Sequence, residues 1–123
     1  MNYLFAFGCP RSGTTALGHV LNRHPSVALG IERFKHIAMS RRVTEFGPDL
    51  FEQARFLDIR HDDTNTTRQN EHLAQKFASG RPIRIIGDKI PRLYHRMTQL
   101  RSVFPEAQLV VIFRDPLDVA LSW

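Results

Sequence analysis

The sequence predicts an α/β fold with three layers, in which helices flank both faces of a parallel sheet. Two observations lead to this prediction. Short apolar runs alternate along the chain with segments of helical periodicity, which is typical of parallel sheets. A glycine-containing turn also follows the first apolar run and directly precedes the first helical segment. The 123 residues are enough for one core, so residues 1–123 are treated as a single domain.

Four apolar runs are expected to form the sheet. They cover residues 3–7, 27–30, 83–87 and 109–113. Helices are predicted between them from apolar spacing and from proline and glycine signals. These helices cover residues 16–21, 48–56, 67–78, 93–103 and 116–123, with a polar loop at 61–66. The first helix is expected to bury the residues that recur at helical spacing, namely Ala16, Leu17, Val20 and Leu21.

The last predicted helix has a clear beginning and no visible end. Asp115 can cap it, and Pro116 suits its first position. The sequence then stops at Trp123 after about two turns of ~3.6 residues each, without a capping residue. We therefore expect the chain to be the N-terminal part of a longer protein, truncated at its C-terminus.

The strongest functional signal is the segment GCPRSGTT, residues 8–15, between the first run and the first helix. It fits the phosphate-loop frame G-x-x-x-x-G-x-[ST], with Thr14 in the place of the usual lysine. Glycines let the backbone curl so that N–H groups point inward, and the helix start adds its positive dipole end. Arg11 can supply the missing charge. The alternative is a glycine turn that only joins strand to helix.

The missing lysine bears on which anion the loop binds. A protein that hydrolyses ATP or GTP needs that lysine on the phosphates and a metal-holding acid on a neighbouring strand. Asp88 follows the third apolar run and can imitate the acid. From the loop alone, a P-loop kinase or NTPase stays open as an alternative.

The second signal is RDPLDVALSW, residues 114–123, directly after the fourth run. Arg114 is expected at the carboxyl end of a strand, where parallel sheets bind ligands. Ser122 follows about two helical turns later. Both side chains reach one phosphate if the helix start folds back toward the strand. The alternative is a solvated arginine before an ordinary helix cap.

Taken together, the two motifs resemble the sulfotransferases that use 3′-phosphoadenosine 5′-phosphosulfate (PAPS). PRSGTT is similar to that family's loop for the 5′-phosphosulfate, in the form found in its bacterial, tyrosylprotein and carbohydrate branches. FRDPLDVALSW is similar to its segment for the 3′-phosphate. The resemblance implies that donor-binding residues are Arg11, Ser12, Gly13, Thr14, Thr15, Arg114 and Ser122.

The same resemblance gives meaning to two further residues. Glu32, in HPSVALGIERF, matches a glutamate that acts as general base on the acceptor. Lys89, in the segment DKIP, matches a lysine of the active site, where it can neutralise charge that develops during transfer. The alternative for both is an ordinary solvated side chain, the commonest state of Glu and Lys.

The resemblance implies a P-loop-like fold and transfer of a sulfuryl group from PAPS, without a metal. The acceptor is a hydroxyl or amine of a small molecule, a carbohydrate or a peptide. A truncated, non-catalytic nucleotide-binding piece is the second alternative, and we expect the isolated chain not to turn over acceptor. Residues 33–82 match no segment of the family that would identify the acceptor.

Composition narrows the class of partner. Seventeen Lys and Arg against twelve Asp and Glu give a net charge of +5, nearly all from arginine, which suits phosphate-like anions. No basic helix or interleaved aromatic residues suggest nucleic acid. No run approaches the roughly 20 apolar residues of a membrane span, and no secretory leader is visible. One cysteine, Cys9, and scattered histidines form no metal spacing. A cytoplasmic location is expected.

Overall fold

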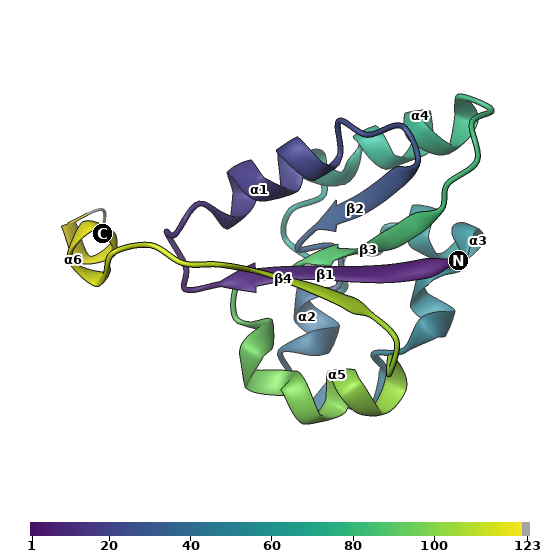
Figure 1. The fold of residues 1–123 in the computed structure, drawn as a ribbon. Coiled ribbons are helices and arrows are strands. Elements are labelled where there is room, and N and C mark those ends of the chain that lie inside the picture. Colours follow the sequence, from purple (N-terminus) through teal and green to yellow (C-terminus); the bar gives the residue numbers. More distant parts are fainter. Residues whose placement is uncertain (122–123) are drawn as a thin grey trace.

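The computed structural model describes residues 1–121, and this part of the chain forms a four-stranded parallel sheet with helices on both faces (Figure 1). The strands lie in the order β2-β3-β1-β4. They are β1 (Asn2–Gly8), β2 (Val27–Ile31), β3 (Ile85–Lys89) and β4 (Gln108–Ile112). Because all pairs are parallel, the four carboxyl ends lie at one end of the sheet. The predicted α/β class with a parallel sheet is confirmed.

Within the described range, six α-helices accompany the sheet. They are α1 (Thr14–Leu21), α2 (Lys35–Ala38), α3 (Gln53–Leu57), α4 (His72–Ala78), α5 (Met97–Val103) and α6 (Pro116–Leu121). In Figure 1, α1 and α4 lie above the sheet, while α2, α3 and α5 lie below it. Helix α6 stands beyond the carboxyl ends of the strands. The carboxyl ends of the strands therefore lead into loops, and they lie outside both helical layers.

Alternate residues of β1 contribute to hydrophobic clusters on opposite faces of the sheet. Leu4 and Ala6 belong to the smaller cluster, beneath α1. Phe5 and Phe7 belong to the larger one, which is rich in phenylalanine. There the rings of Phe5 and Phe104 meet edge to face with centroids 4.8 Å apart. Each buried ring of this kind stabilises the fold by about 1.5–3 kcal/mol.

Strand β3 begins two residues later than the sequence predicted. The backbone N–H groups of Arg84 and Ile85 both donate to the carbonyl of Ser26, at 2.8 and 3.1 Å, so the ladder with β2 starts only at Ile85. The strand then continues through Asp88 and Lys89, which the prediction placed after it. Because side chains alternate along a strand, Asp88 and Lys89 point to opposite faces of the sheet.

Three predicted helices are each divided into a 3₁₀ turn and a short α-helix. The turns are η2 (Pro48–Phe51) before α3, η3 (Arg68–Asn70) before α4 and η4 (Leu93–Arg96) before α5. Glu52 has extended backbone angles, φ −69° and ψ 140°, which end η2 and begin α3. The prediction of one continuous helix was therefore wrong for residues 48–56, whereas Glu71 keeps α-helical angles between η3 and α4. A further turn, η1 (Arg41–Glu45), follows α2.

Helix α1 turns a different face to the sheet from the one predicted. Val20 is 56% exposed and Ala16 is also exposed. The buried residues of α1 are Thr14 and Gly18. A Cβ atom at Gly18 would lie 2.7 Å from the Cδ1 atom of Ile31, so the helix approaches β2 closely and a larger residue there would have to displace the end of that side chain. The two remaining residues of the predicted face, Leu17 and Leu21, do pack against the core.

The two edge strands of the sheet, β2 and β4, differ in what lies along their outer sides. Along β2, the Asn22 amide accepts from the Leu29 N–H at 2.8 Å and donates to the Leu29 carbonyl at 2.7 Å. The Asn70 amide does the same at Ile31, at 2.7 and 2.9 Å. Within residues 1–121, no strand pairs with the outer side of β4, and Phe113 beyond it is 86% exposed. The β2 edge is thus capped by amides, whereas the β4 edge is open.

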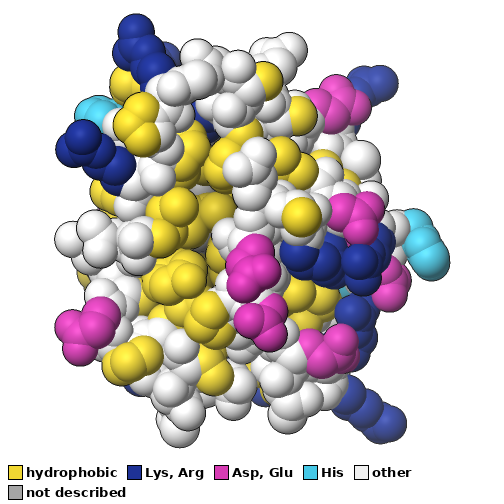
Figure 2. Space-filling view, turned by 90° about the vertical axis from the view of Figure 1, so that its right-hand side faces the viewer, with side chains coloured by type: hydrophobic (Ala, Val, Ile, Leu, Met, Phe, Trp, Pro, Cys, Tyr) yellow, Lys and Arg dark blue, Asp and Glu magenta, His cyan; other side chains and the backbone are white. Residues whose placement is uncertain are grey.

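Figure 2 shows the face that lies to the right in Figure 1. Hydrophobic side chains gather on part of it, and acidic and basic side chains are intermixed beside them. On this face, then, the positive charge is not collected into one basic patch. Among residues 1–121, no helix has the length and apolar character needed to cross a membrane.

Candidate functional site

The loop between β1 and α1 turns through two residues with left-handed backbone angles. Gly13 has a φ of 99° and Arg11 a φ of 71°, both in the left-handed region. A Cβ atom at Gly8 would lie 2.5 Å from the carbonyl oxygen of Ile112, so the loop passes β4 closely. These positions curl the chain at the carboxyl ends of β1 and β4. A non-glycine residue such as Arg11 in this region costs about 1–3 kcal/mol, a kind of strain that gathers at functional sites.

Ser12 carries a group that the loop itself leaves unsatisfied. The Ser12 hydroxyl is buried and has no hydrogen-bond partner among the described residues. Its backbone N–H donates to the Cys9 carbonyl at 3.1 Å and closes a turn, so this amide does not face a ligand as the sequence suggested. The N–H groups at the start of α1, which include those of Thr14 and Thr15, have no acceptors within the helix. A hydroxyl and helix-end amides together suit an anion with several oxygens.

Lys89 reaches this loop from β3. Its side chain is buried, with 1% of its surface exposed, and Nζ donates to Oγ1 of Thr15 at 3.0 Å. The lysine stem runs along α1, because a Cβ atom at Gly18 would lie in van der Waals contact with it, 3.7 Å from its Cβ and Cγ atoms. Burial lowers the pKa of Lys89, and the charges of Glu32 and Asp88 oppose that change. The lysine absent from the loop is therefore replaced in space by one from the neighbouring strand.

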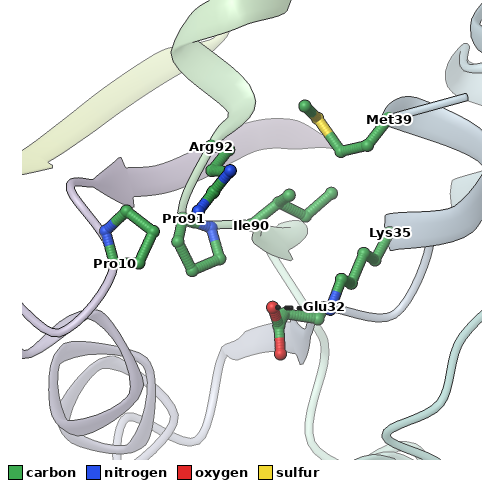
Figure 3. A pocket seen from close by; sticks show the side chains of 7 residues that line it. All are labelled: Pro10, Glu32, Lys35, Met39, Ile90, Pro91 and Arg92. Atoms are coloured by element: carbon green, nitrogen blue, oxygen red, sulfur yellow. Dashed lines mark ion pairs between the residues drawn. The ribbon is translucent and has the colours of Figure 1, made fainter. Parts of the chain in front are cut away.

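Glu32 lies directly after β2 with its carboxylate at the mouth of a pocket. Its backbone is left-handed, with a φ of 53°, and its N–H donates to the Lys89 carbonyl at 2.7 Å. The carboxylate lies 3.7 Å from the Lys35 ammonium, and its side chain is 20% exposed. Figure 3 shows this pair on one side of the pocket and Pro10 and Pro91 on another. The pocket has a volume of about 480 Å³ and is lined by Pro10, Glu32, Lys35, Met39, Ile90, Pro91 and Arg92.

Asp88 is fully buried on the opposite face of β3 from Lys89, where it holds the turn after Glu32. Its two carboxyl oxygens accept the backbone N–H groups of Arg33 at 2.9 Å and of Phe34 at 2.8 Å. Burial raises the pKa of Asp88 to about 7, although the two N–H bonds oppose the rise. Both oxygens are thus engaged by backbone on the side away from the loop. This contact does not suit the metal-holding acid of the kinase alternative.

Arg33, which the sequence did not single out, anchors residues 55–63 beneath the site. Its guanidinium is completely buried; Nε donates to the Phe56 carbonyl at 2.9 Å and Nη1 to Asp63 at 2.8 Å. Arg55 adds a second pair with Asp63 at 2.6 Å. Burial works against ionisation of Asp63, but hydrogen bonds from Arg55 and Arg33 outweigh it and lower the pKa of Asp63. Arg33 stands among other charged residues in the segment IERFKH, so no local signal marks it as buried.

Arg114 approaches the loop from the other side. Its Nη1 donates to the carbonyl of Arg11 at 3.0 Å, so the segment after β4 lies against the phosphate loop. Asp115 accepts the Leu117 N–H at 2.8 Å, which confirms the predicted cap of α6. Ser122, the predicted partner of Arg114, lies outside the described residues.

The predicted site residues that can be located therefore converge on one end of the sheet. The loop residues follow β1, Glu32 follows β2, Lys89 ends β3 and Arg114 follows β4. Across residues 1–121, no group of three or more His, Cys, Asp or Glu side chains is placed to hold a metal ion. The arrangement combines a loop at the start of α1, a buried ammonium and a carboxylate beside a pocket.

Comparison with known proteins agrees with this arrangement. A sequence profile described as the Sulfotransferase family matches residues 4–123. The chain is also similar to the nodulation protein NoeE of Sinorhizobium fredii, with 32% identity over 126 residues. That similarity covers 96% of this chain and 30% of the relative, so the chain spans less than a third of the relative's length. The chain belongs to the sulfotransferase family.

Proposed function

We propose that this chain binds PAPS and supports transfer of its sulfuryl group to a hydroxyl or amine acceptor. The observation that carries the proposal is the contact between Lys89 and Thr15, which joins the phosphate loop to a buried cation. The carboxylate of Glu32 lies on the neighbouring strand end, beside an open pocket. Because the chain belongs to the sulfotransferase family, we assign sulfuryl transfer to this combination of loop, cation and carboxylate.

The donor would be held mainly by the loop. Arg11, Gly13, Thr14 and Thr15 offer backbone N–H groups and hydroxyls for the 5′-phosphosulfate, and the unpartnered hydroxyl of Ser12 fits an anionic oxygen. Arg114 would hold the 3′-phosphate together with Ser122. Because Arg114 already contacts the backbone of Arg11, the two ends of the donor would be bound by segments that touch each other.

When bound, PAPS supplies an electrophilic sulfur and a good leaving group. The role of Glu32 is to accept the proton of the acceptor as its oxygen or nitrogen forms a bond to that sulfur. The sulfur–oxygen bond to 3′,5′-adenosine diphosphate (PAP) breaks at the same time. Lys89 stabilises the negative charge that collects on the transferred group and on the leaving oxygen, because its ammonium is held beside Thr15 away from water.

The pocket beside Glu32 is the place for the acceptor. Its volume of about 480 Å³ suits one or two sugar rings or a side chain of a peptide. Apolar walls from Met39, Ile90 and Pro91 can exclude water around the attacking atom. We therefore propose a small-molecule, carbohydrate or peptide acceptor that presents a hydroxyl or amine to Glu32.

Calorimetry tests the donor assignment on the full-length protein. We expect PAP to bind without a metal and at least tenfold more tightly than AMP, because a charge-assisted contact set is worth about 1.5–3 kcal/mol. A preference for ATP with Mg²⁺, accompanied by ATP hydrolysis, would support the kinase alternative instead. Transfer assays with PAPS and phenolic or sugar acceptors complete the test. PAP binding without any transfer would indicate a non-catalytic nucleotide-binding protein.

A further inference from the structure

The backbone around Glu32 is held in place from three directions. Its N–H donates to the Lys89 carbonyl at 2.7 Å, and its own carbonyl accepts the Thr64 hydroxyl at 2.6 Å. The next two N–H groups, of Arg33 and Phe34, donate to the carboxyl of Asp88. The left-handed φ of 53° at Glu32 is thus enclosed by contacts to β3 and to the segment around Thr64.

Among these contacts, those of Asp88 determine where the chain goes after Glu32. Strand β2 pairs with β3 up to Ile31, and the two N–H bonds to Asp88 then turn the backbone across the end of β3. The turn packs closely on Gly30, which lies opposite Asp88 in the ladder. A Cβ atom at Gly30 would be 2.5 Å from Cβ of Arg33 and 2.9 Å from Oδ1 of Asp88.

This geometry separates the roles of two adjacent residues of β3. Lys89 faces α1 and contacts Thr15, whereas Asp88 faces the other layer and touches neither the loop nor the pocket. Asp88 is nevertheless completely buried, with both oxygens used. A smaller apolar residue would fill this place without burying a carboxyl group, which is costly. The carboxyl therefore serves the turn that follows Glu32.

We infer that Asp88 is a positioning residue that aims the carboxylate of Glu32 into the acceptor pocket. This inference rests on the proposed role of Glu32 as general base. The hydrogen bonds of Asp88 go to the backbone of the turn. Asparagine at this position keeps the shape but offers one acceptor oxygen, so one of the two N–H groups faces an amide that cannot accept its bond. The turn then relaxes and the carboxylate of Glu32 moves.

A double-mutant cycle in the full-length protein tests the inference. Alone, Asp88→Asn should lower kcat roughly 10- to 100-fold, since a displacement of about 1 Å can cost about that much. The PAP dissociation constant should stay within about twofold, because the donor contacts are unaffected. In a Glu32→Gln background, Asp88→Asn should have no further effect on kcat, because the group that it positions is already gone. Rates are expressed per folded molecule, counted by the stoichiometry of PAP binding.

Ile86→Val is the matched control. Ile86 lies two residues earlier on the same face of β3, is buried in the larger hydrophobic cluster and carries no group that can bond to the turn. Its substitution should lower the melting temperature without changing kcat per folded molecule. If Asp88→Asn does not accumulate in folded form, Thr64→Val carries the same cycle, because it removes the hydroxyl bonded to the Glu32 carbonyl.

The possible outcomes separate the inference from the proposed function. Asp88→Asn with wild-type kcat, or with a full extra loss in the Glu32→Gln background, would overturn the positioning role. Glu32→Gln with wild-type kcat would instead overturn the assignment of the base, while leaving the donor site as proposed. A large loss in each single variant with no extra loss in the double variant supports the inference.

Discussion

The two halves of the site are built in opposite ways. Around Glu32, the protein supplies the hydrogen-bond partners of its buried polar groups: Arg33 is paired with Asp63, Asp88 with two backbone N–H groups, and Asn70 with Ile31. Around the phosphate loop, the buried hydroxyl of Ser12 has no partner within residues 1–121. In the first half, the buried polar groups are hydrogen-bonded within the protein. In the second half, the loop keeps a polar group available for a ligand.

The contrast has a physical reason. A general base must be held in one geometry whichever acceptor arrives, so a fixed and fully bonded turn suits it. A donor site has to exchange one anion for another, and groups already bonded within the protein could not serve the ligand. We therefore expect changes near Glu32 to affect turnover and stability, and changes in the loop to affect affinity. The predictions below test that division, from the largest effect to the smallest.

Glu32→Gln should have the largest effect. The amide keeps the shape of the side chain but cannot accept a proton, so kcat should fall by roughly 10²–10⁴-fold. The PAP dissociation constant should be nearly unchanged, because Glu32 lies at the pocket and not in the loop. Single-turnover transfer assays with calorimetry on the same sample measure both quantities. Wild-type turnover would mean that another group takes the proton.

Arg33→Met should chiefly affect folding. Removing one partner of a buried ion pair leaves Asp63 with Arg55 alone, and such changes cost about 3–5 kcal/mol in the free energy of unfolding. Arg42→Gln is the control, because Arg42 pairs with Glu45 at the surface, where an ion pair is worth about 0–1 kcal/mol. Denaturant unfolding compares them. Equal losses of unfolding free energy in the two variants would show that the Arg33–Asp63 pair stabilises the fold no more than a surface ion pair does.

Arg114→Gln should reduce the preference for PAP over AMP. Loss of a charge-assisted contact to the 3′-phosphate costs about 1.5–3 kcal/mol, roughly tenfold or more in PAP affinity, while AMP affinity should hardly change. Arg41→Gln, at another exposed arginine, serves as the control. Competition calorimetry gives both constants. If AMP and PAP weaken equally, Arg114 supports the loop backbone rather than the 3′-phosphate.

Ser12→Ala should change stability and affinity in opposite directions. Without ligand, the variant should be as stable as the wild type or more stable by about 1 kcal/mol, because an unpaired buried hydroxyl is removed. PAP affinity should nevertheless fall several-fold. Ser102→Ala, at an exposed serine of α5, should change neither quantity. A drop in ligand-free stability would indicate that the hydroxyl already has a partner in the protein.

Asp88 should make the free energy of unfolding depend on pH. Its pKa is raised from 3.8 to about 7 by burial, so between these values the folded state binds one more proton than the unfolded state. The contribution of Asp88 is therefore fully present below about pH 4 and is lost as the pH rises toward about 7. Relative to Asp88→Asn, the wild type should therefore lose free energy of unfolding as the pH rises from about 4 to about 7. A shift in favour of the wild type over this range would contradict the raised pKa.

How much of this could be read from the sequence depended on whether the signal was local. The phosphate loop, β1, β4 and the Asp115 cap follow from short patterns, and each was found close to where the sequence placed it. The start of β3 was misplaced because the Ser26 carbonyl, which sets it, lies on another part of the chain. Periodicity likewise favoured Val20 over Gly18, since close packing against Ile31 leaves no trace in hydropathy.

The residues that hold the turn around Glu32 had the weakest signals in the sequence. Arg33 and Asp63 are thirty residues apart, and nothing local indicates that they pair in the interior. Asp88 appeared as a possible metal ligand because it follows the third apolar run, and only the register of β3 shows that it faces away from the loop. The donor residues, by contrast, lie in two short motifs, residues 8–15 and 114–123, so that a resemblance to the family could name them from the sequence. Long-range pairing therefore limited what the sequence could give about the site.

Amide hydrogen exchange with and without PAP tests the division of the site most directly. We predict that saturating PAP slows exchange in the loop at residues 8–15 and in the segment after β4, by a factor that reflects the ligand's binding free energy. Residues 30–34 and 55–70 should already be protected and should change little. Protection that appears around Glu32 only when PAP binds, with no change in the loop, would contradict the account, because the base side would then be ordered by the ligand and the donor side would lie elsewhere.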